Sequence, residues 1–175
     1  MALLRAVNVG GHSVDKHALG EAFTRAGGAH VRTVIQSGNV LFEAAASEVN
    51  DVVAGARRRL RRVLGVEPVV MLRSAADITR LLRHGPFART AAPPEIKRYI
   101  VFLAGPAATR PRLPVRLPKE ALDLVHVSKR ECWVVSRCKP NGWYGFPGDF
   151  VEATVGVAGT ARNWSTVMKL AARLE

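Results

Sequence analysis

The sequence predicts an α+β protein whose first half is ferredoxin-like, with the order β-α-β-β-α-β. Within the first 74 residues, short segments rich in β-branched residues alternate with two stretches whose apolar residues recur at helical spacing. That order is typical of an antiparallel sheet with two helices on one face. Residues 75–175 predict a second α+β half, related in plan but irregular. We expect it to pack against residues 1–74 in one compact unit.

The elements of the first half follow from apolar spacing and from the residues that end each segment. Predicted strands cover residues 2–9, 30–36, 40–44 and 66–74. Predicted helices cover residues 13–28 and 47–65. Ser13 or Asp15 can cap the first helix, and Gly27-Gly28 closes it. The second helix has an apolar stripe of Val49, Val52, Val53, Ala56, Leu60 and Val63.

The second half is less regular. Predicted helices cover residues 74–85, 149–157 and 160–174, and predicted strands cover residues 96–105, 123–127 and 131–138. Capping boxes at Ser74/Asp77 and Asp149/Glu152 indicate where two of these helices begin. The proline-rich segment 106–121 should be mostly irregular. The last helix has one apolar face, made of Trp164, Val167, Met168, Ala171 and Leu174.

The composition fits a small globular protein. The chain has 175 residues, of which 48% are hydrophobic and 23% charged, near the averages of globular domains. No apolar stretch approaches the roughly 20 residues that cross a bilayer. Arg5 and Asn8 interrupt the start, where a signal peptide would need a continuous apolar run. We therefore expect a soluble, cytoplasmic protein that makes no membrane contact.

The net charge of +12 permits two interpretations. Twenty-six Lys and Arg residues against 14 Asp and Glu residues are typical of a nucleic-acid binder. Arginine supplies most of the positive charge, and Ala, Gly, Val and Pro are also plentiful, a pattern that GC-rich codons produce without selection for a ligand. Charge alone therefore leaves a nucleic-acid partner and a compositional bias both open.

The cysteines and histidines indicate no bound metal. Cys132 and Cys138 fall in one predicted strand, where an extended chain would separate them by about 20 Å, beyond the reach of a disulfide. We expect two reduced thiols, as in a cytosol. The five histidines form no zinc-ligand pattern. We expect neither a metal nor a cofactor.

Polar residues near the end of the first strand raise the question of a ligand. Alternation places Asn8 on one face of the strand and Arg5 among apolar residues on the other. A buried guanidinium is costly unless it is paired, so we expect Arg5 at a sheet edge, at a seam between subunits or half-domains, or in a pocket beside an anion. The structural alternative is an ion pair with a carboxylate such as Glu43 or Asp149. The amides of Gly10-Gly11, ahead of a helix, can bind an anion. A plain turn is the alternative.

Two further stretches have both a structural and a functional interpretation. The arginine-rich run 57–62 is either the solvated face of an amphipathic helix or a stripe that contacts phosphates. The aromatic stretch 143–146 either stacks on a base or fills the core. An RNA-recognition sheet is disfavoured, because the first strand has no aromatic residue and the third offers only Phe42.

Thr160, Arg162 and Asn163 lie around the predicted start of the last helix. Thr or Asn there is expected as an N-cap. Arg162 is less expected, because the helix dipole disfavours a cation at that end. An anion between Arg162 and the helix start would explain it, and a salt bridge elsewhere is the alternative.

Three stretches together resemble a known family: ALLRAVNVGG, VRTVIQSGNVLFE and TARNWSTVMKLAARL. They look like the signature stretches of a bacterial family of uncharacterised proteins, the domain-of-unknown-function 1697 family. The resemblance covers essentially the whole chain and implies an α+β fold with ferredoxin-like halves, a cytosolic protein and no established activity. Its motifs fall on Arg5, Asn8, Gly10, Gly11, Gln36, Ser37, Gly38, Asn39, Thr160, Arg162, Asn163, Trp164, Thr166 and Lys169.

The chain departs from the family pattern in two places. Members usually begin a few residues before the first strand, so we expect the natural start to lie earlier. A Ser-Lys-Leu-Thr-Asn type sequence is common before the penultimate helix, where this chain has PNGWYGFPGDF. The resemblance therefore implies no role for a lysine at that place in this protein.

Three functions follow as hypotheses. The first is binding of an anionic ligand, namely a nucleotide, a phosphometabolite or a nucleic-acid backbone. Its candidate contacts, which should converge on one pocket, are Arg5, Asn8, Gly10, Gly11, Ser37, Asn39, Thr160, Arg162 and Asn163. The second is an interaction or structural module with no small-molecule ligand. The third is an enzyme acting on a phosphorylated small molecule, for which the sequence identifies no catalytic residue. Oligomeric state stays open.

Overall fold

The computed structural model describes residues 1–5, 14–35, 38–85, 87, 93 and 95–174. Contacts between Cα atoms divide the chain into two units, Met1–Ser74 and Ala75–Glu175. Each unit has its own antiparallel sheet, so the protein has the mixed α+β architecture that the sequence predicts.

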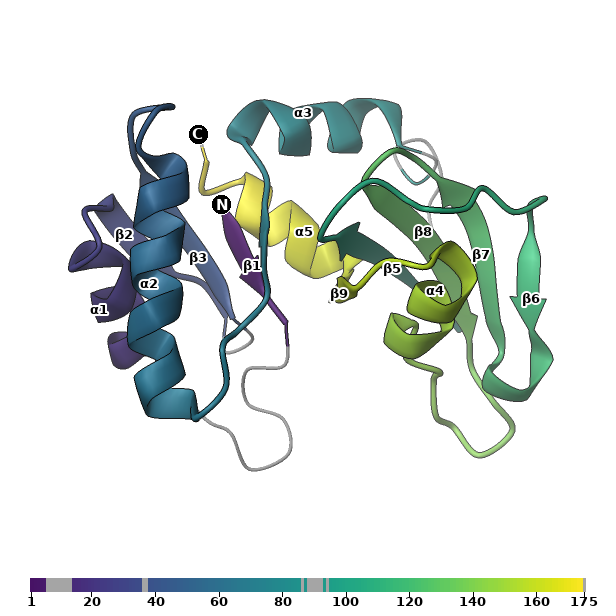
Figure 1. The fold of residues 1–175 in the computed structure, drawn as a ribbon. Coiled ribbons are helices and arrows are strands. Elements are labelled where there is room, and N and C mark those ends of the chain that lie inside the picture. Colours follow the sequence, from purple (N-terminus) through teal and green to yellow (C-terminus); the bar gives the residue numbers. More distant parts are fainter. Residues whose placement is uncertain (6–13, 36–37, 86, 88–92, 94, 175) are drawn as a thin grey trace. The chain divides into compact units, whose positions relative to one another are not determined.

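The first unit has the predicted order β-α-β-β-α-β. Its elements are β1 (Ala2–Leu4), α1 (Lys16–Thr24), β2 (Ala29–Thr33), β3 (Asn39–Glu43), α2 (Val49–Leu64) and β4 (Val70–Leu72). The strands pair antiparallel in the order β2-β3-β1-β4, the ferredoxin-like arrangement. Figure 1 shows α1 and α2 beside this sheet. Strand β2 forms one edge, and its ladder with β3 shifts register between Ala29 and Arg32.

Both helices of the first unit cover the same face of the sheet. Ala2 and Leu4 of β1 share one apolar cluster with Phe23 of α1 and with Ala56 and Leu60 of α2. Of the two predicted caps for α1, Asp15 is the one used, because its Oδ1 accepts a hydrogen bond from the amide of Ala18 at 2.7 Å. Helical spacing thus turns the predicted apolar stripes inward.

One member of the predicted stripe of α2 is wrong. The side chain of Val63 is 60% exposed, and Leu64 takes the buried position at the end of the helix. The helix ends at Gly65, which adopts a left-handed conformation with φ +73°. In the last turn the buried position therefore shifts by one residue, from Val63 to Leu64. The apolar spacing of the sequence does not predict this shift, which occurs beside the helix end.

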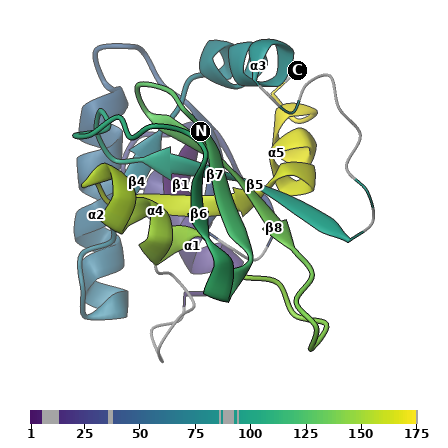
Figure 2. The ribbon, with the colours of Figure 1, turned by 90° about the vertical axis from the view of Figure 1, so that its right-hand side faces the viewer.

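The second unit has a larger sheet with helices on both faces. Its elements are α3 (Ala75–His84), β5 (Ile96–Leu103), β6 (Val115–Leu117), the 3-10 helix η1 (Pro118–Glu120), β7 (Leu122–Val127), β8 (Glu131–Arg137), α4 (Gly148–Val155), β9 (Gly159–Asn163) and α5 (Trp164–Ala171). The sheet has the antiparallel order β6-β7-β8-β5-β9. Figure 2 shows the β7–β8 hairpin beside β6 and β5.

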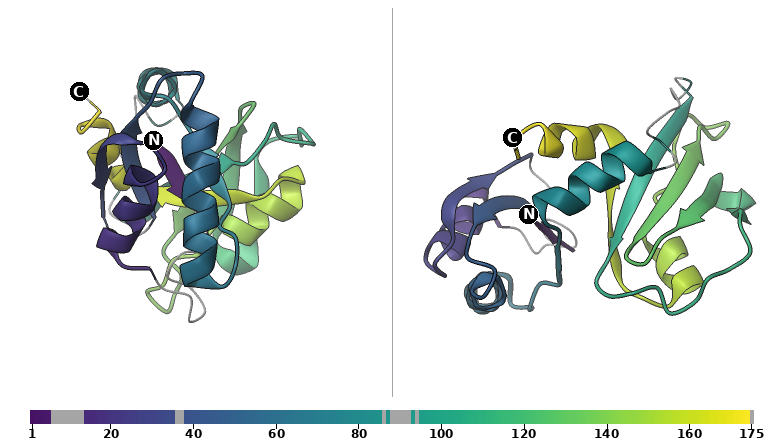
Figure 3. Two further views of the ribbon diagram at one scale, coloured as in Figure 1. Left: turned by 60° about the vertical axis from the view of Figure 1, so that its left-hand side comes forward. Right: turned by 90° about the horizontal axis from the view of Figure 1, so that it is seen from above.

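Alternation along the strands divides the core of this unit. Val101 and Cys132 pack with Val151 and Val155 of α4 on one face. Their chain neighbours point to the opposite face, the side on which Figure 3 shows α3 and α5. There Trp164 of α5 meets Phe87 edge to face, with ring centroids 5.6 Å apart.

The predicted last helix begins later than its pattern indicates. Gly159–Asn163 forms strand β9, which pairs with β5 from Leu103 opposite Gly159 to Tyr99 opposite Asn163. A Cβ atom on Gly159 would lie only 2.6 Å from Cγ1 of Val101, so this close strand contact needs glycine. Pairing with β5 satisfies the backbone of this segment and overrides its helical pattern.

Two smaller predictions in this unit are also wrong. The residue at the N-cap of α4 is Pro147, and no side chain caps that helix, so Asp149 and Glu152 do not form the expected capping box. Met168 is 52% exposed, and the buried face of α5 consists of Trp164, Val167 and Leu170.

Candidate functional site

Arg162 is a buried cation held in one position. It is 7% exposed and lies on β9 opposite Ile100 of β5. Its Nη1 donates to Thr160 Oγ1 at 2.7 Å and to the carbonyl oxygen of Ala161 at 2.8 Å. Burial lowers the pKa of Arg162 to about 10, because desolvation disfavours the charged form, so the guanidinium still carries its charge at pH 7.

Asn163 follows directly and begins helix α5. Its Oδ1 accepts hydrogen bonds from the amide of Ser165 at 3.0 Å and from Ser165 Oγ at 2.9 Å. Asn163 is therefore the N-cap, one of the two residues that the sequence offered for this role. Thr160, Arg162 and Asn163 thus lie within four residues, at the point where β9 passes into α5.

The candidate residues of the first unit are described only in part. Asn8, Gly10, Gly11 and Ser37 lie outside the described residues. Arg5 is half-buried, and its amide donates to the carbonyl oxygen of Val69 at 2.9 Å.

Asn39 has a structural role in the β2–β3 connection. It is fully buried, and its Nδ2 donates to the carbonyl oxygen of Val34 at 3.0 Å. The amide of Val34 in turn donates to the carbonyl oxygen of Asn39 at 3.0 Å. These bonds close the hairpin that the sequence predicts around residues 37–39.

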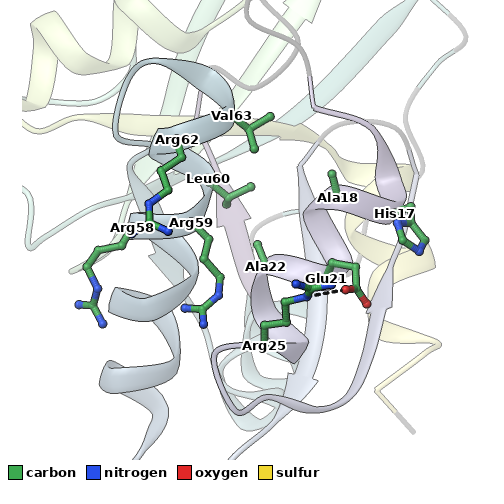
Figure 4. A pocket seen from close by; sticks show the side chains of 10 residues that line it. All are labelled: His17, Ala18, Glu21, Ala22, Arg25, Arg58, Arg59, Leu60, Arg62 and Val63. Carbon is green, nitrogen blue, oxygen red and sulfur yellow. Dashed lines mark hydrogen bonds and ion pairs between the residues drawn. The ribbon is translucent and has the colours of Figure 1, made fainter.

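A groove between α1 and α2 gathers arginines that lie far apart in the sequence. It has a volume of about 630 Å³. Its polar lining is His17, Glu21 and Arg25 from α1 and Arg58, Arg59 and Arg62 from α2. Figure 4 shows the α2 arginines projecting from one side of the groove and the Arg25–Glu21 pair on the other. The sequence marked the run 57–62 but gave no sign that Arg25 would join it, because helix packing brings them together.

Two of the three aromatic side chains in the stretch 143–146 do not fill the core. Trp143 is 73% exposed and Phe146 is 67% exposed, so the core-filling interpretation is wrong for both. Phe146 contacts Tyr99 edge to face, with ring centroids 6.0 Å apart. Lys97 Nζ lies 4.0 Å from the ring centre of Tyr144. Stacking of these rings on a base stays a prediction.

Within the described residues, His, Cys, Asp and Glu side chains form no group of three or more that could hold a metal ion. Both cysteines are free, with Cys132 buried and Cys138 exposed. Burial, with a smaller effect of Glu131, raises the pKa of Cys132 to about 12. No helix in the described part of the chain could serve as a membrane span.

Comparisons with known proteins give a fold and a family. No curated protein matches the chain. A solved structure, described as the conserved bacterial protein SP0830 from Streptococcus pneumoniae, matches with a TM-score of 0.59 and 18% sequence identity over 99% of this chain and 97% of that one. At this identity the match shows a shared fold. The family described as "Protein of unknown function (DUF1697)" matches residues 1–133, and the chain belongs to that family.

Proposed function

We propose that the protein binds an anionic ligand, either a nucleotide, a phosphometabolite or a nucleic-acid backbone, at its motif residues. The proposed contacts are Arg5, Asn8, Gly10, Gly11, Ser37, Asn39, Thr160, Arg162 and Asn163. The observation that carries the proposal is the position of Arg162, a nine-tenths-buried guanidinium one residue before the N-cap of α5. A cation and a helix N-terminus both favour an anion.

The energetics of Arg162 support the same proposal. A buried guanidinium loses hydration, and the lowered pKa of Arg162 reflects that cost. A bound anion would offset part of the cost by Coulomb attraction in a medium of low dielectric. The bonds to Thr160 and Ala161 fix the guanidinium before a ligand arrives, so little conformational entropy is lost on binding.

A second candidate function is an interaction or structural module without a small-molecule ligand. Asn39 and Asn163 favour it, because their side chains close a hairpin and cap a helix. These two residues could thus be part of the motif for the sake of the fold alone. An enzyme acting on a phosphorylated small molecule stays a third hypothesis.

Thermal unfolding with a panel of anions tests the proposal. The panel holds inorganic phosphate, nucleotides, sugar phosphates and short oligonucleotides, at low and moderate salt. A ligand at 100 times its dissociation constant should add about 2.7 kcal/mol of stability. The stabilisation should disappear in Arg162→Ala and persist in Arg116→Ala, which removes an exposed arginine from β6 of the same unit.

Arg5 and Arg162 belong to different units, and their convergence on one ligand stays a prediction. A double-mutant cycle tests it, because residues that share one bound anion should give non-additive losses of binding free energy. Binding that survives Arg162→Ala unchanged, or an absence of stabilisation by every anion in the panel, would refute the proposal and favour the structural module.

A further inference from the structure

Helix α2 carries its arginines in two rows with different surroundings. Arg57 and Arg61 are four residues apart and share a side of the helix. Arg57 Nη2 lies 2.7 Å from Glu67 Oε1, and Arg61 Nη1 lies 4.0 Å from Glu67 Oε2. Arg57 Nε also donates to the carbonyl oxygen of Pro68 at 3.1 Å. One carboxylate therefore balances part of the charge of this row.

The second row has no such compensation from the described part of the chain. Arg58, Arg59 and Arg62 are exposed and line the groove toward α1. Among the described residues, no carboxylate lies within 4.0 Å of any of these three guanidinium groups. The groove contains one acidic residue, Glu21, and its Oε2 pairs with Nε of Arg25 at 2.8 Å. Four arginines and one glutamate leave the lining strongly cationic.

The spacing and chemistry of this row fit a chain of phosphates. Arg58 and Arg62 are one helical turn apart, which is about 6 Å along the axis. A nucleic-acid strand rises about 3.4 Å per phosphate, so the pair spans about two phosphate steps. Guanidinium groups bind phosphate oxygens through two parallel N–H bonds, a geometry that lysine does not offer.

The remaining lining distinguishes among polyanions. Among the described residues that line the groove there is no Trp, Tyr or Phe, so they offer no platform on which an unstacked base could lie. This favours a duplex over a single strand. A membrane surface is disfavoured, because the apolar face of α2, including Val52, Ala56 and Leu60, is buried against the sheet and is not available to lipid.

We propose that the α1–α2 groove binds the phosphate backbone of a duplex nucleic acid without reading its sequence. The proposal goes beyond the anion site at Arg162, because it uses residues of the first unit only. The contribution of each arginine of α2 to duplex binding depends on its position on the helix and not on the total net charge of +12.

Fluorescence anisotropy with a 20-base-pair DNA duplex tests the proposal. Three phosphate contacts predict a slope of about −2.7 for log K against log salt, which is a loss of about 40-fold between 50 and 200 mM salt. The double variant Arg58→Gln/Arg62→Gln should reduce the slope to about −0.9 and the loss to about 4-fold. The control Arg57→Gln/Arg61→Gln removes the same charge from the same helix and should keep the slope of the wild type.

Further binding measurements distinguish duplex binding at the groove from other interactions. A duplex of unrelated sequence should bind equally well, and Arg116→Ala, which removes an exposed arginine from β6 of the second unit, should bind the duplex as the wild type does. Circular dichroism melts should show that both double variants fold. Equal weakening by the two double variants would reduce the effect to net charge and overturn the proposal. Tighter binding of the single strand, of polyglutamate or of phosphatidylserine vesicles, or no duplex binding at 50 mM salt, would overturn it as well.

Discussion

Gly145→Ala should destabilise the second unit severely, because the backbone of another segment occupies the space that a Cβ atom needs. That atom would lie 2.2 Å from the carbonyl oxygen of Glu120 and 3.0 Å from Cγ of Leu122. The oxygen belongs to η1, where the Ala121 amide donates to the carbonyl oxygen of Pro118 and the Ala121 carbonyl accepts from the amide of Arg137. A rigid neighbour cannot yield, so the loop around Gly145 must move.

The magnitude follows from two costs. Forcing an extra methyl group into a packed site typically costs about 1–3 kcal/mol. Moving the loop also breaks the hydrogen bond that Ser136 Oγ donates to the carbonyl oxygen of Gly145 at 3.0 Å. Ser136 is fully buried, and an unsatisfied buried hydroxyl costs about 1–3 kcal/mol. The expected loss is therefore about 2–6 kcal/mol of unfolding free energy.

Urea denaturation followed by tryptophan fluorescence measures this loss. The chain has three tryptophans, Trp133, Trp143 and Trp164, and all belong to the second unit, so the signal reports on the unit that the substitution perturbs. Gly105→Ala is the matched control, because its Cβ would meet no atom within 4 Å and should change stability by less than about 1 kcal/mol. A loss below about 1 kcal/mol in Gly145→Ala would refute the close packing.

Two further predictions concern the same unit. Cys138 should react with iodoacetamide in the folded protein and Cys132 should not, because Cys132 is fully buried and its pKa is raised to about 12. Mass spectrometry should find one adduct without urea and two adducts in urea. Two adducts that form rapidly in the folded protein would contradict the burial of Cys132. Because the pKa of Cys132 in the folded protein lies above the ordinary value of 9.0, the neutral thiol contributes its full share of the unfolding free energy below about pH 9. That contribution is lost as the pH rises toward 12. Asn163→Ala should lower the unfolding free energy by about 1 kcal/mol, because α5 loses its N-cap, whereas Asn163→Ser should retain most of it; equal urea midpoints for both variants would argue against capping.

The first unit was predictable because its pattern is local. The apolar residues of α1 and α2 recur at helical spacing, and β2 and β3 meet at a short turn, so the order β-α-β-β-α-β follows without knowledge of distant contacts. The sequence predicts Asp15 and Asn163 as caps for the same reason, since a cap depends on a few neighbouring residues. Local rules therefore predict the element order of the first unit and the cap residues of α1 and α5.

The errors arise where distant contacts decide. Thr160 to Asn163 continue a helical pattern upstream, but their backbone pairs with β5, some 60 residues earlier in the chain. The exposure of Trp143 likewise depends on where its loop lies in the folded unit, which the neighbouring residues in the sequence do not determine. Tertiary pairing of this kind outweighs local propensity.

The candidate sites also combine features that the local sequence predicts with features that depend on distant contacts. The run 57–62 could be singled out from its sequence, but its two rows differ through contacts outside the run. Glu67, beyond the end of α2, faces one row, and helix α1 lies across the groove from the other. Arg25 joins the other row through the packing of α1 on α2. Sequence reasoning thus found the charge, and the fold distributes it.

The register shift in β2 has a consequence for solubility. An edge strand presents unpaired amide and carbonyl groups that invite a strand from a second copy of the chain. Here the edge strand β2 is bulged between Ala29 and Arg32, His30 has φ +49°, and the exposed positions include Arg32. A distorted, cationic edge is a poor template for another strand. This edge therefore opposes sheet-to-sheet aggregation at high protein concentration.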